Sequence, residues 1–154
     1  MLSRRARSNP SCNRRDTLLQ APPDGTAGSG PMVLKLGILG AGHFGRFHAL
    51  KAAKASAAGQ VEFLGLADAS AERAALVAAE AGTRAWPVEA LIEAADALIV
   101  AAPTEFHFAL ASQVLAAGRH VFVEKPIAAT LEQADALVAQ AATAGRVLQV
   151  GHVE

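Results

Sequence analysis

Residues 33–45 read Val33-Leu34-Lys35-Leu36-Gly37-Ile38-Leu39-Gly40-Ala41-Gly42-His43-Phe44-Gly45, and this stretch decides the fold. An apolar run too short for a helix leads directly into the glycine pattern G-x-G-x-x-G. A proline-free segment typical of a helix follows, from residue 43 to about residue 57. This order of strand, glycine turn and helix is typical of a turn that binds the pyrophosphate of a dinucleotide. The pattern alone leaves an ordinary glycine-rich turn as the alternative.

Each glycine of the motif has its own predicted task. Gly40 permits the tight turn after the strand, Gly42 lets a pyrophosphate approach the backbone, and Gly45 lets the helix pack closely on the strand. The helix begins at His43 and Phe44, where free amides and the positive end of the helix dipole attract phosphates. We therefore predict cofactor contacts from these five residues.

The composition gives no sign of a nucleic-acid or membrane partner. The chain has 154 residues, enough for one domain with a buried core. Its 14 basic and 14 acidic side chains give a formal net charge of +0. Its longest apolar run, near residues 97–102, is too short to span a bilayer. The single cysteine, Cys12, excludes a disulfide framework and fits a reducing cytoplasm.

Residues 1–31 differ in composition from the rest of the chain. They carry five arginines against two aspartates, a charge of +3, and show little hydrophobic periodicity. We interpret them as a disordered extension that ends in a linker, and Met32 as the natural start of a domain over residues 32–154. The segment lacks the amphipathic stripe of an organelle-targeting peptide. A nucleic-acid-binding tail is the weaker alternative.

From Met32 onward, predicted strands and helices alternate. The strands are nearly continuous apolar runs, which indicates burial on both faces of a parallel sheet covered by helices. Ser70 and Thr130 are expected N-caps, and a glycine stands just past each of four helices. The sequence therefore predicts an α/β fold, a doubly wound parallel sheet of the Rossmann type, with six strands in the order 3-2-1-4-5-6. The expected strands are 33–39, 61–67, 84–86, 97–101, 119–123 and 146–150, and the expected helices are 43–57, 70–81, 88–94, 106–117 and 131–143.

Asp68 closes the second predicted strand, at the distance from the glycine motif that a ribose-binding acid requires. Its carboxylate is expected to accept hydrogen bonds from the adenosine ribose and to repel a 2′-phosphate. Ala69 follows with no basic side chain, so NAD is favoured over NADP. Arg73, one helical turn further on, is an argument for NADP, but we place it on the solvated helix face. The alternative role for Asp68 is a helix cap, which Ser70 can supply instead.

The loop after the fourth predicted strand should border the dinucleotide, because ligands of such sheets lie beyond the carboxyl ends of the strands. We predict cofactor contacts from Pro103 and Thr104, and Thr104 can also cap the helix that follows. A histidine in a first helical turn is more often a packed residue than a catalyst. We therefore place His107 with the cofactor contacts and not with the catalytic groups.

The fifth predicted strand ends in Glu124-Lys125-Pro126, on the side where the nicotinamide should lie. A lysine there can act on a substrate hydroxyl as a hydrogen-bond donor or as an acid/base group. Pro126 restricts Lys125 to extended conformations and so aims its side chain. A solvated Lys-Pro turn remains the alternative on these grounds. The five histidines have no metal-ligand spacing, so we predict no metal site.

Four segments together resemble the Gfo/Idh/MocA oxidoreductases, a family named for glucose–fructose oxidoreductase and inositol dehydrogenase. They are residues 37–45, Ala67-Asp68, residues 103–107 and residues 118–126. The resemblance implies NAD(P)-dependent oxidation or reduction at a carbon that bears a hydroxyl, in sugars, cyclitols or sugar nucleotides. It also implies that Lys125 assists proton movement, while Glu124 and Pro126 shape the cofactor pocket.

The resemblance also defines what this sequence lacks. The second domain of the family, which holds the substrate pocket and the oligomerisation sheet, is missing, so the chain is expected to be the nucleotide-binding half of a dehydrogenase. A homo-oligomer is expected only with that second domain. Two other functions stay open. One is a non-catalytic NAD-binding or sensing module, and the other is a methyltransferase, against which the glycine spacing and residues 124–126 argue.

Overall fold

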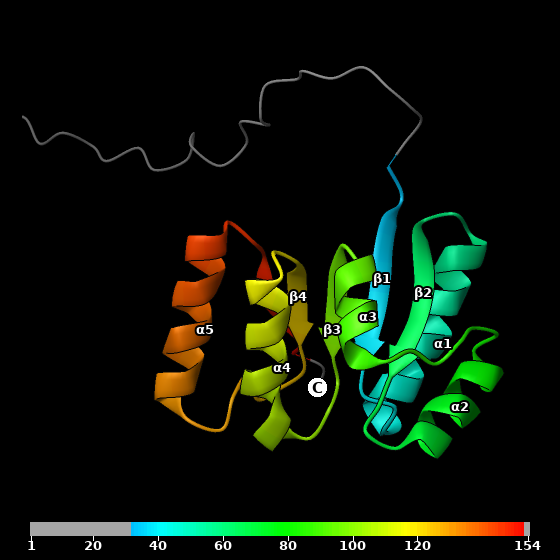
Figure 1. The fold of residues 1–154 in the computed structure, drawn as a ribbon, viewed down its shortest axis with the longest axis horizontal. Coiled ribbons are helices and arrows are strands. Elements are labelled where there is room, and N and C mark those ends of the chain that lie inside the picture. The colour runs from blue at the N-terminus through cyan, green and yellow to red at the C-terminus, as the bar shows by residue number, and fades with distance from the viewer. Residues whose placement is uncertain (1–31, 153–154) are drawn as a thin grey trace, which may run out of the picture. The chain divides into compact units, whose positions relative to one another are not determined.

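The computed structural model describes residues 32–152. The predicted extension, residues 1–31, and the last two residues lie outside the described part. Ten elements follow one another along the described chain, and strands alternate with helices except where α2 is followed by α3 (Figure 1). They are β1 (Leu34–Leu39), α1 (His43–Ala57), β2 (Val61–Ala67), α2 (Ala71–Glu80), α3 (Val88–Ala94), β3 (Ala97–Val100), α4 (Thr104–Ala116), β4 (His120–Val123), α5 (Leu131–Ala144) and β5 (Leu148–Val150).

The strands form one parallel sheet in the order β2-β1-β3-β4-β5. β1 lies between β2 and β3, and its residue Leu39 pairs with Ala67 of β2 and with Val100 of β3. The carboxyl ends of these three strands therefore lie together at one edge of the sheet. The predicted doubly wound parallel fold is confirmed, and the strands expected fourth to sixth are β3, β4 and β5.

The prediction of a strand over residues 84–86 is wrong. This segment makes one isolated parallel bridge, between Leu66 and Ala85, so the sheet has five strands. The Trp86 amide donates to the Leu66 carbonyl at 2.9 Å, but the pairing stops there, because Pro87 is the N-cap of α3 and the chain enters that helix at Val88. The bridge still lies beside β2, where the predicted order placed the third strand.

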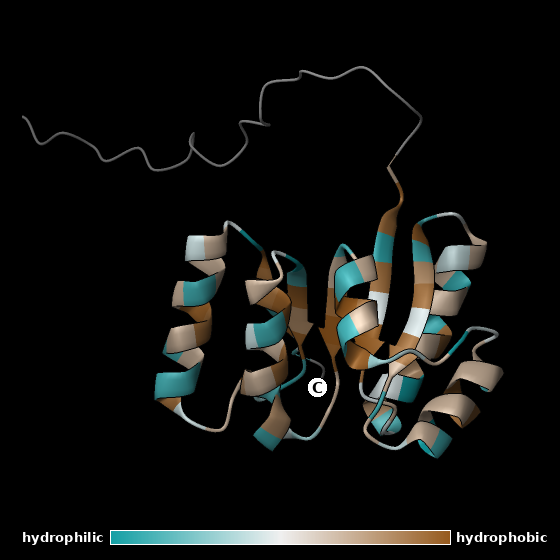
Figure 2. Ribbon diagram, viewed as in Figure 1, coloured by the Kyte–Doolittle hydropathy of each residue, from teal (hydrophilic) through white to brown (hydrophobic). Residues whose placement is uncertain are grey.

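Helices cover both faces of the sheet (Figure 1). α1 and α2 pack on one face, around Ile38 and Leu66, largely through alanines. α3, α4 and α5 pack on the other face, around Leu98 and Val123. Figure 2 shows the consequence, since the strands are mostly hydrophobic while polar residues lie along the helices. The alanine-rich helix faces allow this close approach of helices to the sheet.

Local capping signals account for most of the helix ends. Ser70 Oγ accepts from the Arg73 amide and Thr130 Oγ1 accepts from the Gln133 amide, as predicted. The predicted cap by Thr104 is wrong, because α4 begins at Thr104 itself and Pro103 holds the N-cap position without a side-chain hydrogen bond. The four predicted C-terminal glycines all have positive φ, at Gly59 (70°), Gly82 (64°), Gly118 (70°) and Gly145 (62°).

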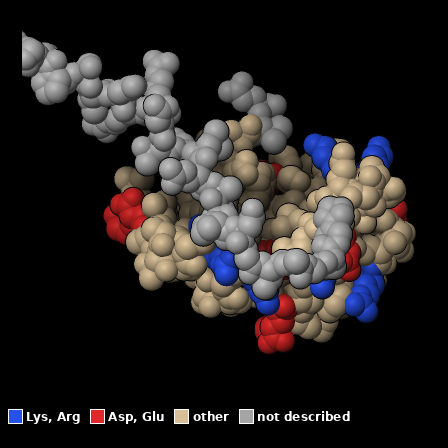
Figure 3. Space-filling view, turned by 90° about the horizontal axis from the view of Figure 1, so that it is seen from above, with Lys and Arg blue, Asp and Glu red and all other residues tan. Residues whose placement is uncertain are grey.

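Charges of both signs are mixed over the visible surface of residues 32–152. On the face drawn in Figure 3, Lys and Arg side chains are interspersed with Asp and Glu, and no broad area of one sign stands out. Within this part of the chain, no helix is both long and apolar enough to cross a membrane.

Candidate functional site

The glycine turn after β1 is packed so tightly that two of its glycines have no room for a side chain. Gly40 has φ +109°, and a Cβ there would lie 2.6 Å from the Ala101 carbonyl oxygen. A Cβ on Gly45 would lie 2.0 Å from the carbonyl oxygen of Gly40. At Gly42, in contrast, a Cβ would meet nothing within 4 Å. Gly40 and Gly45 therefore serve the fold, while Gly42 leaves open space above the turn.

The N-terminus of α1 opens toward that space. Gly42 is its N-cap, no side chain caps it, and its first turn contains no acidic residue. His43 and Phe44 are exposed, with the His43 ring edge-on to Phe44 at 5.6 Å and to Phe47 at 4.8 Å. A helix end with free amides and no nearby carboxylate from its own first turn is suited to binding an anion.

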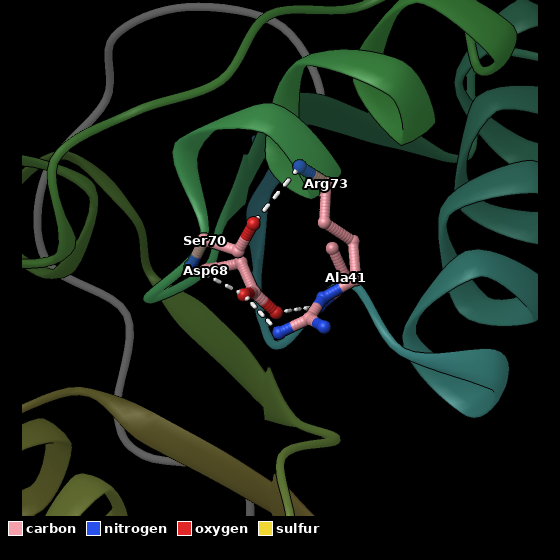
Figure 4. Close-up of polar contacts among 4 residues, drawn as sticks. All are labelled: Ala41, Asp68, Ser70 and Arg73. Atoms are coloured by element: carbon pink, nitrogen blue, oxygen red, sulfur yellow. Dashed lines mark hydrogen bonds and ion pairs between the residues drawn. The ribbon is translucent and has the colours of Figure 1, made fainter.

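Asp68 connects the end of β2 to the glycine turn (Figure 4). Its Oδ2 accepts from the Ala41 amide at 2.7 Å, and its Oδ1 accepts from the Ser70 amide at 2.8 Å. Arg73 also donates to Oδ1, at 2.7 Å. The carboxylate therefore fixes the turn, begins α2 and holds an arginine, with a side chain only 7% exposed.

The Arg73 contact adds to the sequence-based placement of that side chain. Arg73 is 54% exposed, in keeping with the solvated face of α2, and its guanidinium group also reaches back to Asp68, because the ionised carboxylate attracts it. Burial is the largest single influence on the Asp68 carboxyl and opposes ionisation. The hydrogen bonds from Arg73, Ser70 and Ala41 together outweigh burial and lower the pKa of Asp68 below its ordinary value.

A pocket of about 370 Å³ lies beside this network, within the size range of small-molecule sites. Its walls come from the loops after β1, β2 and β3, and it brings together Gly40, Asp68 and Pro103. Arg73 lies at its margin, and Phe106 and other apolar side chains of α4 complete the wall. Thr104 lies in the first turn of α4 but does not line the pocket.

The residues predicted after β4 form a second group. Lys125 and Pro126 are exposed and joined by a cis peptide bond, whereas Glu124 is buried. The Glu124 carboxylate lies 2.5 Å from Nε2 of His48, which reaches it from α1. Sequence reasoning did not select His48. The feature that could have identified His48 is its polar side chain on the buried stripe of α1, one position before Ala49.

His107 is fully enclosed, with only 1% of its surface exposed. Its Nδ1 lies 2.7 Å from the Pro126 carbonyl oxygen and its Nε2 lies 2.7 Å from the Ala102 carbonyl oxygen. The ring therefore joins the loops after β3 and β4, and its predicted contact with a cofactor stays a prediction. Among residues 32–152, no group of three or more potential ligands could hold a metal ion.

Comparison with known proteins finds one family and a consistent set of relatives. The family model described as "Oxidoreductase family, NAD-binding Rossmann fold" matches residues 34–152. UDP-N-acetylglucosamine 3-dehydrogenase of Acidithiobacillus ferrooxidans is 43% identical over 122 residues, which cover 79% of this chain and 37% of that protein. Inositol 2-dehydrogenase 1 of Saccharopolyspora erythraea is 35% identical over 128 residues, with the same two coverages, 79% and 37%. The chain thus spans little more than a third of these relatives.

Comparison with solved structures also finds proteins that share this fold. That of the Acidithiobacillus enzyme superposes with a TM-score of 0.73 at 42% identity, over 79% of this chain and 39% of the other. GenD2 from gentamicin A biosynthesis, in complex with NAD, gives 0.70 at 28% identity, over 82% and 37%. Biliverdin reductase from Synechocystis, in complex with NADP⁺, gives 0.67 at 27% identity, over 77% and 38%. Neighbours of this fold therefore hold either nucleotide.

The Asp68 network predicts a pH-dependent contribution to stability. Because the folded-state pKa lies below the ordinary value of 3.8, ionised Asp68 stabilises the fold above that value, and the contribution is lost as the pH falls through the lowered pKa. Asp68→Asn should reduce the free energy of unfolding by about 1–3 kcal/mol at neutral pH. In urea denaturation over a pH series, this deficit should stay constant down to about pH 5 and shrink below about pH 4.

The exposed residue Asp135 offers a matched control, since Asp135→Asn removes a carboxylate from the surface of α5. Its effect should stay within about 0.5 kcal/mol of zero at neutral pH. A deficit for Asp68→Asn that is equally large at neutral and at acidic pH would show that the carboxylate charge does not contribute.

Proposed function

The chain belongs to the Gfo/Idh/MocA family of oxidoreductases, and we propose that it binds NAD for the oxidation of a CH–OH group in a sugar, a cyclitol or a sugar nucleotide. The observation that carries the proposal is the Asp68 carboxylate, held at 2.7 Å from the Ala41 amide of the glycine turn, beside a pocket bounded by three strand ends. The glycine turn and the acid proposed to bind the ribose are thereby in contact with each other.

The described residues fit each part of NAD. The open space above Gly42 and the uncapped N-terminus of α1 suit the pyrophosphate. The pocket beside Asp68 suits the adenosine, with the carboxylate accepting from the ribose hydroxyls. The loop after β4, residues 124–126, is proposed to border the nicotinamide.

Lys125 is the proposed catalytic residue. Bound NAD would supply the hydride acceptor for the substrate carbon. In oxidation, the Lys125 amine would take the proton that leaves the substrate hydroxyl, and in reduction its ammonium group would return that proton. The exposed position of Lys125 at the end of β4 supports this role, since its side chain is free to meet a substrate.

NAD is the proposed cofactor in preference to NADP. Asp68 is ionised at neutral pH, and a carboxylate at the ribose repels a 2′-phosphate. Arg73 offsets part of this repulsion, because its guanidinium group lies against the same carboxylate. We therefore propose a moderate preference and not an absolute one.

The substrate and the assembly belong to the whole enzyme. Because this chain spans 37% of its relative from Acidithiobacillus, the remaining walls of a substrate site lie outside the residues in hand. We propose a small sugar or polyol substrate, no nucleic-acid or membrane partner, and a homo-oligomer formed only through a second domain. The single residue Cys12 supports a cytoplasmic location.

Gly42→Val should abolish NAD binding without unfolding the chain. The valine side chain would fill the space that the pyrophosphate needs, while a Cβ at this position meets nothing within 4 Å in the protein. Isothermal titration calorimetry with NAD should show a loss of at least about tenfold in affinity. The control Ala139→Val, at an exposed position of α5, should bind NAD as the wild type does. Undiminished affinity of Gly42→Val, or binding of S-adenosylmethionine in place of NAD, would contradict the proposal.

Arg73→Ala should make the site more selective for NAD. Removal of the guanidinium group leaves the Asp68 charge unscreened, so the affinity for NADP should fall by about threefold to tenfold while that for NAD changes less. Competition titrations with both nucleotides measure the ratio. Arg84→Ala removes an arginine that stacks over Trp86 and should leave the ratio unchanged. Equal losses for both nucleotides would show that Arg73 does not discriminate between them.

Lys125→Ala should retain NAD affinity but prevent turnover. A hybrid in which residues 32–152 replace the matching part of the Acidithiobacillus dehydrogenase allows the test, with NADH absorbance as the readout and UDP-N-acetylglucosamine as the substrate. We expect the substitution to lower kcat by at least about 100-fold, since it removes the acid/base group. Full activity would remove Lys125 from the mechanism. NAD binding by the wild-type chain without turnover of the hybrid would favour a non-catalytic NAD-binding module.

A further inference from the structure

Lys125 lies between two residues that each contact a histidine. Glu124, which precedes it, contacts His48 of α1, and Pro126, which follows it, contacts His107 of α4. We propose that these two histidines are positioning residues, which fix the backbone on both sides of Lys125 and so present its side chain to the nicotinamide end of the cofactor. The inference rests on the proposed function, which places the nicotinamide at this loop.

The first contact is the side-chain pair of His48 and Glu124. His48 Nε2 donates to Glu124 Oε1 at 2.5 Å, and the two side chains are only 18% and 7% exposed. A carboxylate this buried requires a donor, and His48 provides one. Gly151 encloses the other side, because a Cβ there would lie 3.0 Å from Glu124 Oε2. Phe122 meets the His48 ring edge-on at 5.6 Å. Glu124 is therefore confined on several sides.

The second contact, from His107, restrains the backbone after Lys125. The buried His107 ring has its Nδ1 2.7 Å from the Pro126 carbonyl oxygen and its Nε2 2.7 Å from the Ala102 carbonyl oxygen. Carbonyl oxygens only accept hydrogen bonds, so the ring donates from each nitrogen that carries a proton. His107 thereby joins the loop after β4 to the end of β3, which borders the pocket.

The two histidines reach the loop after β4 from opposite faces of the sheet. α1 packs on the face with Ile38, and α4 packs on the face with Leu98 (Figure 1). A loop held from one face alone can pivot, whereas this loop cannot shift in either direction without breaking a buried hydrogen bond. Because α1 also begins at the glycine turn, the helix proposed to bind the pyrophosphate is the one that holds Glu124.

Such an arrangement matters because a lysine side chain is long and flexible. Its amine reaches one position reproducibly only if the backbone that carries it is fixed. Displacement of a reacting group by about 1 Å can lower a rate by about 100-fold. The two histidines leave the Lys125 side chain free to move while they restrain its neighbours, and no other residue need touch the amine before the substrate arrives.

The test compares NAD with ADP-ribose, which lacks the nicotinamide, by isothermal titration calorimetry of the whole chain. The wild type should bind NAD more tightly than ADP-ribose, and the ratio of the two affinities is the advantage that the variants test. The backbone of residues 124–126 is proposed to border the nicotinamide, and Lys125→Ala leaves that backbone in place. His48→Ala and His107→Ala loosen it, so they should reduce this advantage by about threefold to tenfold, with ADP-ribose affinity changed less than about twofold. His48→Gln, which keeps an N–H donor for Glu124, should restore most of the advantage. His120→Ala, in β4, should leave it unchanged.

The outcomes separate this inference from the proposed function. An unchanged advantage for NAD in folded His48→Ala would overturn the inference and leave the proposed function intact. Parallel losses for NAD and ADP-ribose would also overturn it, since they indicate only a structural role. Equal affinities of the wild type for the two ligands would remove the nicotinamide site, and the inference with it. If thermal melting shows His107→Ala to be unfolded, the His48 series decides.

Discussion

The contact between α1 and the carbonyl group of Gly40 is the constraint on which the site depends. A side chain at Gly45 would lie 2.0 Å from that oxygen, so the helix can begin where it does only because this residue is glycine. This close approach points the N-terminus of α1 into the open space at Gly42 and places Ala41 within 2.7 Å of Asp68. A single steric constraint thereby sets both the proposed phosphate site and the position of Asp68, the acid proposed to bind the ribose.

Asp68 serves the fold and the proposed ligand with the same two oxygen atoms. Three protein donors already occupy the carboxylate, which explains why it stays ionised although its side chain is only 7% exposed. A ribose must therefore share these oxygens or displace a donor. Arg73 is the donor most easily displaced, because its side chain is 54% exposed and the other two donors are backbone amides. The proposed discrimination between NAD and NADP would consequently depend on an ion pair and not on one acidic residue alone.

Sequence and structure agree where a local signal decides the outcome. Near-continuous apolar runs predicted the strands of the sheet, and Ser70 and Thr130 began helices as their hydroxyl groups indicate. The errors arose where two signals competed. Residues 84–86 have a strand-like composition, but they make a single bridge because α3 begins directly after them, with Pro87 as its N-cap. Thr104 has a good capping side chain, yet α4 already includes it.

The sequence by itself determined the family, the glycine turn and the acid at the end of β2, because each depends on short runs of consecutive residues. Only the tertiary structure decided how the charged and polar side chains pair. Arg73 turned to Asp68, and His48 met Glu124, which is 76 positions away in the chain. Such contacts depend on how the helices pack on the two faces of the sheet, and helical periodicity predicts which face of a helix is buried but not which partner it meets.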